Sequence, residues 1–192
     1  VDILFGLFGD DALYGSLGAD TMDGGDGKDT VSYYNSTSAV DVDMMRAKQR
    51  GGGAEGDALV SIENVSGSGW HDRLFGDNSV NVLSGNIGDD VLNGRGGADV
   101  LFGGTGRDRF VFSSASEADG DFVADWNDGD SFDLSGIDAD VVTVGMQSFR
   151  FVTSQGFSST AGEVRLSNDG MDSFVSGDTD GDGQADFTIR IA

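Results

Sequence analysis

The sequence predicts an all-β chain in which short parallel strands wind into a roll, with two blocks of repeats separated by an insert. Glycine makes up 32 of the 192 residues, whereas an average globular chain contains about 7% glycine. Of the 34 acidic residues only four are glutamate, and aspartate favours turns over helix surfaces. A period of nine residues runs through the two blocks, 6–32 and 67–111, and leaves the insert at 33–66. Together these features disfavour a helical bundle.

Each repeat of nine keeps four positions nearly constant. The first block reads GLFGDDALY, GSLGADTMD, GGDGKDTVS, and the second reads GSGWHDRLF, GDNSVNVLS, GNIGDDVLN, GRGGADVLF, GGTGRDRFV. Position one is always glycine, and position four is glycine except at Trp70 and Ser79. Position six is aspartate except at Asn81, and position eight is apolar in all eight nines. Asp2 and Leu4 fit positions six and eight of an earlier nine, so we expect the chain to start within a repeat.

The physical roles of these positions predict metal-binding turns between short strands. Positions seven to nine form a strand whose middle side chain points inward, so the apolar eighth residues stack into a narrow core. Positions one to six form a turn in which glycine permits unusual φ angles and close backbone approach. The turn presents carbonyl and carboxylate oxygens, and Ca2+ takes six to eight such ligands. A flexible linker, the alternative, would not keep an apolar residue at every ninth place.

One turn cannot supply all the ligands of a calcium ion, so we expect ions to lie between turns. If successive nines alternate between the two sides of the roll, turn n faces turn n + 2. The expected ions lie between the turns that start at 67 and 85, 76 and 94, 85 and 103, 6 and 24, and between the truncated start and 15. Ser79 and Asn81 make the repeat at 76 the weakest donor. The candidate ligands from the repeats are Gly6, Gly9, Asp11, Gly15, Gly18, Asp20, Gly24, Gly27, Asp29, Ser68, Trp70, Asp72, Gly76, Ser79, Asn81, Gly85, Gly88, Asp90, Gly94, Gly97, Asp99, Gly103, Gly106 and Asp108.

Three further motifs, taken with the repeats, are similar to a known family. They are SIENVSGS (61–68), the DRFVF that closes the last nine (108–112), and DFVADWNDGDSFDL (121–134). This order resembles the C-terminal region of serralysin-type secreted metalloproteases, a module also found in other type I-secreted RTX proteins such as alginate epimerases. The resemblance covers essentially the whole chain. It implies a calcium-bound parallel β-roll over residues 1–112, capped by a C-terminal β-sandwich over residues 113–192.

The resemblance also implies calcium ligands outside the repeats. Glu63 in SIENV, Asp121 and Asp130 match the family's ligand positions, whereas Asp125 and Asp133 are expected to make structural hydrogen bonds. The zinc-binding helix of these proteases, H-E-x-x-H, is absent, so any protease domain is expected to lie outside this chain. The family usually continues beyond ADFTIRI, and we therefore expect both ends of the sequence to be cut.

The C-terminal part contains a separate acidic segment, GDTDGDGQADF. Asp178, Asp180, Asp182 and Asp186 fit the early positions of an EF-hand-like calcium loop. The twelfth position of such a loop, however, is isoleucine here rather than a bidentate glutamate, and strands rather than helices are expected to flank it. A calcium site and a plain solvated turn both stay open for this segment.

Composition excludes several classes of function. The chain has no cysteine, so disulfides, thiolate zinc sites and cysteine nucleophiles are excluded. Its single histidine, His71, stands at an outward repeat position where no catalytic role is expected. The net charge of −23 opposes nucleic-acid binding, and no apolar run reaches the about 18 residues of a membrane span. Trp70 and Trp126 could stack on a sugar, although packing within the fold explains them more simply.

The predicted function is that of a non-catalytic calcium-binding module, which folds and stabilises a larger secreted protein such as a serralysin-like metalloprotease. Without metal the stacked carboxylates repel, so the chain is expected to fold only when about five to nine Ca2+ ions bind. Export from a Gram-negative bacterium by the type I secretion machinery would bring it into calcium-rich extracellular medium. Two alternatives are a module that binds an acidic, alginate-like polysaccharide and a calcium-dependent adhesive segment of the cell surface.

Overall fold

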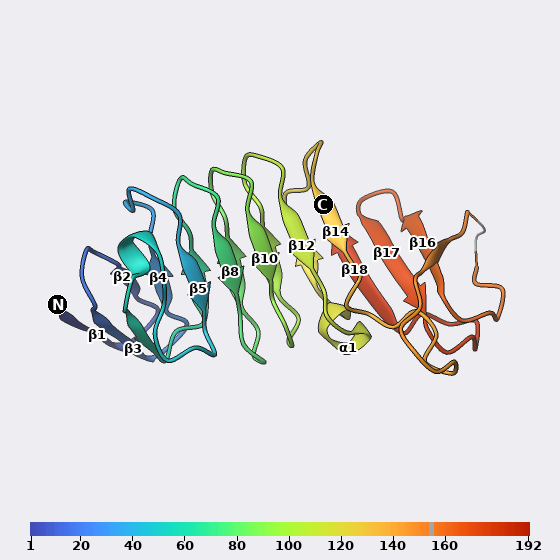
Figure 1. Ribbon diagram of the computed structural model, residues 1–192, viewed down its shortest axis with the longest axis horizontal. Helices are drawn as coiled ribbons and strands as arrows, with labels where there is room; N and C mark the ends of the chain where they lie inside the picture. Colours follow the sequence, from blue (N-terminus) through green and yellow to red (C-terminus); the bar gives the residue numbers. More distant parts are fainter. Residues whose placement is uncertain (154–155) are drawn as a thin grey trace.

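The structure is a computed structural model that describes residues 1–153 and 156–192, and it is an elongated roll of short strands (Figure 1). The strands follow one another along the long axis, from β1 (Ile3–Phe8) near the N-terminus to β16 (Glu163–Asn168) at the far end. In the described ranges helix is confined to a 3₁₀ turn, η1 (Gly52–Ala54), and to α1 (Ala115–Ala118). None of the described helices is long and apolar enough to cross a bilayer.

The repeats form strands at the predicted seventh to ninth positions, which confirms the all-β class and the parallel roll. One strand of the first block, β3, runs three residues further than predicted, into the following turn. The repeat strands are β2 (Ala12–Tyr14), β3 (Thr21–Asp26), β4 (Thr30–Ser32), β8 (Arg73–Phe75), β9 (Val82–Ser84), β10 (Val91–Asn93), β11 (Val100–Phe102) and β12 (Arg109–Val111).

Successive nines alternate between the ten-stranded sheet, which holds β2, β4, β9 and β11, and two smaller sheets, which hold β3 and then β8, β10 and β12. β8, β10 and β12 are neighbours in one sheet, where Arg73 pairs with Val91 and Val91 pairs with Arg109. β9 and β11 are neighbours in the other sheet, where Val82 pairs with Val100. Each partner lies two nines further along the chain, and the same offset joins β1 to β3 and β2 to β4. Turn n therefore faces turn n + 2, as predicted.

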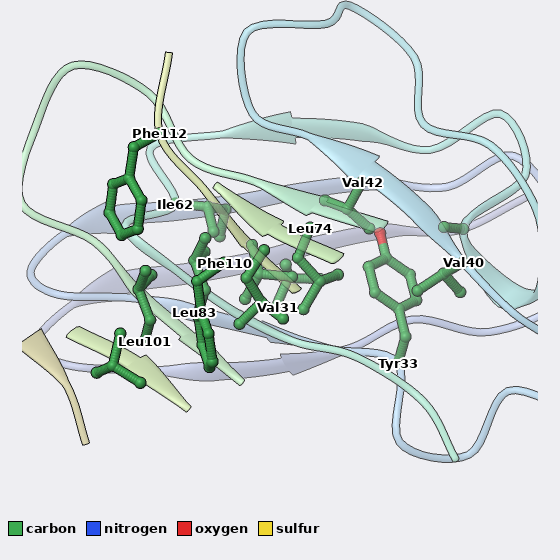
Figure 2. Close-up of a cluster of buried hydrophobic side chains, with 14 of the residues drawn as sticks. Val31, Tyr33, Val40, Val42, Ile62, Leu74, Leu83, Leu101, Phe110 and Phe112 are labelled. Carbon is green, nitrogen blue, oxygen red and sulfur yellow. The ribbon is translucent and has the colours of Figure 1, made fainter. Parts of the chain in front are cut away.

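The eighth residues of the nines form the core between the two sheets. Seven of these side chains are fully buried, and Leu13 near the N-terminal end is 5% exposed. Figure 2 shows Val31, Leu74, Leu83 and Leu101 lying in one continuous apolar row with Phe110. The inward side of each short strand thus contributes one apolar side chain, which explains why the period of nine keeps an apolar residue at that position.

The insert continues the roll instead of leaving it. Its strands are β5 (Asp41–Asp43), β6 (Ala58–Val60) and β7 (Asn64–Ser66). β5 pairs with β8, β6 pairs with β3, and β7 lies between β4 and β9. The insert therefore joins the two repeat blocks into one body.

The C-terminal residues extend both sheets of the second repeat block. β13 (Phe122–Val123) and β14 (Ser131–Asp133) each add a strand beside β11 and β12. Beyond β13 the sheet continues through β18 (Phe187–Ile191), β17 (Ser173–Asp178), β16 and β15 (Arg150–Phe151), and β16 to β18 are antiparallel. The ring of Phe149 packs edge-on against Phe187 at 5.7 Å. The predicted domain boundary at residue 112 and the predicted sandwich cap stay predictions. The strands beyond residue 112 are hydrogen-bonded into the sheets of the roll.

Candidate calcium sites

The first-position glycines mark the places where paired turns touch. At Gly6, Gly76 and Gly85 a Cβ would overlap the carbonyl oxygen of the glycine that lies 18 residues further on. At Gly67 the Cβ would lie 3.1 Å from the Gly85 carbonyl oxygen. The same Cβ would also meet a side-chain oxygen of the sixth residue of its own turn. The missing side chain leaves a small space into which both oxygens point, and four of the five predicted pairs of turns meet in this way.

The fourth-position residues stack along the turns through their backbones. A Cβ at Gly88 or Gly97 would lie 2.5 Å from the carbonyl oxygen of Trp70 or Ser79, respectively. Gly27 and Gly106 face the carbonyls of the corresponding earlier glycines in the same way, and all four glycines have positive φ. Only glycine adopts this conformation freely at so close a contact. The position-four carbonyl groups that are predicted to bind calcium therefore lie in two regular rows, one on each side of the roll.

The sixth-position side chains form a ladder of hydrogen bonds between turns. The backbone N–H of Asp72 donates to Oδ1 of Asp90 at 2.7 Å, and the N–H of Asp90 donates to Oδ1 of Asp108 at 2.8 Å. On the opposite side the N–H of Asn81 donates to Oδ1 of Asp99 at 2.8 Å. The first block repeats the pattern from Asp11 to Asp29. One oxygen of each carboxylate is thus used to hold the turns in register.

The second oxygen of many of these carboxylates has no partner. Oδ2 is buried and makes no hydrogen bond in Asp11, Asp29, Asp90, Asp99, Asp108 and Asp121. A buried carboxylate oxygen without a partner is costly, because it has lost its hydration without replacement. Carbonyl and carboxylate oxygens are the ligands that Ca2+ prefers. These turns therefore fit calcium, which would supply the missing positive charge between the paired turns.

The acid–base properties of the four C-terminal members of this set reflect the unpaired charge. Burial is the main cause that raises the pKa of Asp90 to about 7, with neighbouring Asp72 and Asp108 adding repulsion. Burial likewise raises the pKa of Asp99 and of Asp108 to about 6 and that of Asp121 to about 8. Asp20 differs, because a hydrogen bond from the Ser16 hydroxyl lowers its pKa. Raised pKa values in the metal-free roll mean that a bound cation would displace protons.

The ligands implied from outside the repeats occupy rungs of the same ladder. Glu63 accepts from the N–H of Asp29, Asp121 from that of Asp99, and Asp130 from that of Asp108. Asp125 instead accepts from the N–H groups of Gly103 and Gly104, which is the structural hydrogen bonding expected of it. Asp133 similarly accepts from Ser135 and pairs with Arg109 at 3.3 Å.

Sequence reasoning missed one member of the ladder, Asp57. Its Oδ1 accepts from the N–H of Asp20 at 2.7 Å, and its Oδ2 accepts from the hydroxyl of Tyr33 at 3.1 Å. The signal was present in the sequence, because Asp57 and the three residues after it read D-A-L-V and reproduce positions six to nine of a repeat. Of the five positions before Asp57 the first is Gly52, but the fourth is Glu55 instead of glycine and the nine stands outside both repeat blocks, which hid the match.

The acidic segment near the C-terminus brings three of its four candidates together. Carboxylate oxygens of Asp178, Asp180 and Asp186 lie within 4.8 Å of one another. Asp178 already accepts from the N–H groups of Gly181 and Gly183, and Asp186 accepts from Thr179. Asp182 bonds to Gln184 and lies outside the trio. A calcium ion here would compete with hydrogen bonds that already hold the turn, so this site stays a prediction.

The aromatic candidates and the histidine lie in ordinary structural environments. Trp126 stacks on Phe132 with ring centroids 4.6 Å apart and lies 6.1 Å from Phe110, which agrees with packing within the fold. Trp70 is half exposed on a turn. The Nδ1 atom of His71 accepts a 2.5 Å hydrogen bond from the N–H of Asp89.

The fold and these turns define a parallel β-roll whose turns fit calcium, and a family model of calcium-binding repeats matches two parts of the chain. The family described as the RTX calcium-binding nonapeptide repeat (4 copies) matches residues 1–31 and 71–110, so the chain carries RTX calcium-binding repeats. Among solved structures it is similar to the solution structure of the AlgE6R3 subunit from the Azotobacter vinelandii mannuronan C5-epimerase. The identity is 20%, the TM-score is 0.36, and the match covers 96% of this chain and 71% of that chain. No curated protein sequence matches the chain.

Proposed function

We propose that this chain is a non-catalytic module that folds when calcium binds, after export by a type I secretion system, and that it stabilises a larger secreted protein. The observation that carries the proposal is the set of six buried carboxylate oxygens without partners, five of which lie beside the first glycine of a repeat turn. Calcium would bridge each carboxylate to the carbonyls of the facing turn. The parent protein that best matches the motif order is a serralysin-like metalloprotease or a similar hydrolase.

Electrostatics makes folding depend on the ion. The chain has a net charge of −23, and the ladder places successive carboxylates 18 residues apart in sequence beside each other in space. Each Ca2+ ion adds two positive charges between turns, so its binding energy contributes directly to folding. Extracellular calcium modules bind at about 10⁻⁴–10⁻³ M, which keeps such a chain unfolded where free calcium is scarce. The absence of proline and cysteine removes two slow folding steps.

A calcium titration of the purified chain tests this function. Circular dichroism at neutral pH should show little strand structure in chelator and a cooperative gain of strand structure as calcium is added. Size-exclusion chromatography should show the elution volume shifting to that of a compact chain over the same concentrations. Magnesium serves as the control, since it demands octahedral geometry and dehydrates reluctantly. A chain that is strand-rich in chelator and unchanged by calcium would contradict the proposal.

A second candidate function, binding of an acidic polysaccharide, is favoured by the outer face of one sheet. Arg73 and Arg109 lie exposed in one cross-strand row and are separated only by Val91 on β10. Two strand spacings place their backbones about 10 Å apart. The row offers two guanidinium groups to carboxylates of a glycan, although Arg109 also pairs with Asp133 and Asp41 lies opposite Arg73.

Calorimetry with alginate in the presence of calcium tests the second candidate. The double variant Arg73→Gln, Arg109→Gln should lose binding, while Arg107→Gln on an exposed turn should retain it. Absence of heat with the wild-type chain would rule out the polysaccharide and leave the folding function untouched.

A further inference from the structure

The eight repeat turns fall into two conformational classes, distinguished by the second residue of the nine. In five turns this residue has a left-handed backbone, with φ between +67° and +96°. We call these the open turns, and their second residues are Leu7, Gly25, Asn86, Arg95 and Gly104. In the other three, which we call the closed turns, the second residue lies outside the left-handed region. These residues are Ser16, Ser68 and Asp77.

The two classes match the state of the sixth-position side chain without exception. Each open turn has a buried Oδ2 with no partner, and these atoms belong to Asp11, Asp29, Asp90, Asp99 and Asp108. In each closed turn the second residue donates a hydrogen bond to the side-chain oxygen of the sixth residue. The hydroxyl of Ser16 donates to Asp20 at 2.8 Å, and the N–H of Asp77 donates to Oδ1 of Asn81 at 2.8 Å.

Ser68 closes its turn most completely. Its N–H donates to Oδ2 of Asp72 at 2.5 Å, and its hydroxyl donates to Oδ1 of the same residue at 2.7 Å. The N–H of Val40 donates to Oδ1 as well, at 2.8 Å. Asp72 is buried, yet both of its oxygens have donors from the chain itself. No unsatisfied oxygen of Asp72 is left for a cation to compensate.

The turn that starts at Gly15 is blocked by an aromatic ring. In four other turns a Cβ on the first glycine would meet a glycine carbonyl oxygen of the facing turn. At Gly15 it would meet the ring of Tyr33 instead. The Tyr33 hydroxyl then reaches Oδ2 of Asp57. A side chain of the insert thus occupies the space that the facing turn and an ion would otherwise share.

Backbone strain in the open turns indicates that something must offset it. A left-handed conformation is unfavourable for most residues other than glycine, and Leu7 and Arg95 adopt it, as does Asn86, for which it is less costly. Each of these turns also contains a buried carboxylate oxygen without a donor. A cation that binds that oxygen and the turn's carbonyls would compensate both costs, whereas a closed turn has neither to compensate.

We propose that calcium binds at the open turns and not at the closed turns, where Ser16, Ser68 and Asp77 replace the ion. The inference rests on the proposed calcium-binding function and specifies which of its sites exist. The closed turns lie near the insert, where hydrogen bonds of the chain itself replace the ion. The open turn that starts at Gly24 also faces the insert, at the carbonyl oxygen of Ser61, and on this proposal it still binds calcium.

Counting bound calcium ions by native mass spectrometry tests the proposal on the full chain. Leu7→Ser changes the first turn from GLFGDD to GSFGDD, which resembles the closed turn GSLGAD, and should remove one ion. Leu7→Gly is the matched control, because glycine adopts the left-handed conformation freely, and it should bind as many ions as the wild type. The Leu7 side chain is 66% exposed, so neither change disturbs the core. In the opposite direction, Ser68→Gly removes the hydroxyl donor, frees the backbone to become left-handed, and should add one ion.

The outcomes separate this inference from the function on which it rests. A wild-type chain that binds no calcium would refute the proposed function itself. A wild-type chain that binds calcium, with equal counts for Leu7→Ser and Leu7→Gly or no gain for Ser68→Gly, would overturn only the division into two classes. Circular dichroism of each variant in calcium checks that the roll has formed.

Discussion

The hydroxyl of Tyr33 donates a 3.1 Å hydrogen bond to Oδ2 of Asp57, and both side chains are completely buried where the first repeat block meets the insert. Burial is the main cause that raises the pKa of both groups, and their proximity raises that of Tyr33 further. The bond gives Oδ2 of Asp57 a donor, which the Oδ2 atom of the sixth-position aspartate lacks in every open turn. It therefore stabilises the middle of the roll without calcium.

Tyr33→Phe should destabilise the chain by about 1–3 kcal/mol, because it leaves a buried carboxylate oxygen without its donor. Urea unfolding in saturating calcium measures the change. Tyr34→Phe is the control, since Tyr34 is the next residue and its side chain is 61% exposed. Calcium stoichiometry should stay the same in both variants. Equal stability of the two variants would show that the Tyr33 hydroxyl contributes nothing.

Asp90→Asn should change the chain in opposite directions with and without calcium. The amide oxygen can keep the hydrogen bond from Asp72, while the new NH2 group can donate toward the Gly103 carbonyl oxygen, which lies in the same space beside Gly85. In chelator, strand content by circular dichroism should rise, because an unpaired buried charge is gone. In calcium, one ion fewer should bind and the Tm should fall. Asp128→Asn makes the same charge change at an exposed residue. It should leave the strand content in chelator, the number of bound ions and the Tm in calcium unchanged.

Metal-free folding should be favoured by acid. The pKa values of about 6 to about 8 at Asp90, Asp99, Asp108 and Asp121 lie above those of unfolded aspartate. The folded chain therefore binds more protons than the unfolded chain, and its stability falls as pH rises. In calcium-free buffer, strand content should be greatest near about pH 4, where aspartate of the unfolded chain titrates, and should be lost progressively up to about pH 8.

Calcium should reverse this pH dependence, because protons and calcium compete for the same carboxylates. The apparent calcium affinity should increase from pH 6 to pH 8, with proton release measurable in weakly buffered solution. A metal-free chain whose strand content is constant or rises over this range would contradict the assigned environment of the four carboxyl groups.

Gly106→Ala should disrupt the stacking of turns. Gly106 has a φ of +146°, and a Cβ there would overlap the carbonyl oxygen of Gly88. We expect a loss of about 1–3 kcal/mol in the free energy of unfolding in calcium from backbone strain alone. Gly69→Ala is the matched control in another repeat turn, because a Cβ at Gly69 meets nothing within 4 Å. If both variants unfold at the same urea concentration, the close approach is not a requirement of the roll.

The period of nine determined most of the roll by itself. An apolar residue at every eighth position can only be buried if successive strands face each other across a narrow core, as Leu74, Leu83 and Leu92 do. The same spacing placed Asp72, Asp90 and Asp108 on one rung after another. These features could be read from the sequence because they are local and repeated, so each nine confirms the next.

The tertiary structure alone decided how the non-repeating parts join the roll and which turns lack a donor. Asp57 reaches the ladder across 37 residues. Arg190 of β18 pairs with Phe122 of β13, 68 residues earlier, although the period of nine does not extend to either strand. Whether a carboxylate oxygen has a donor depends on the backbone conformation of the second turn residue and on side chains such as Tyr33, which arrive from other segments. Composition and spacing identify the possible ligands, but the satisfaction of each buried oxygen is a property of the packed chain.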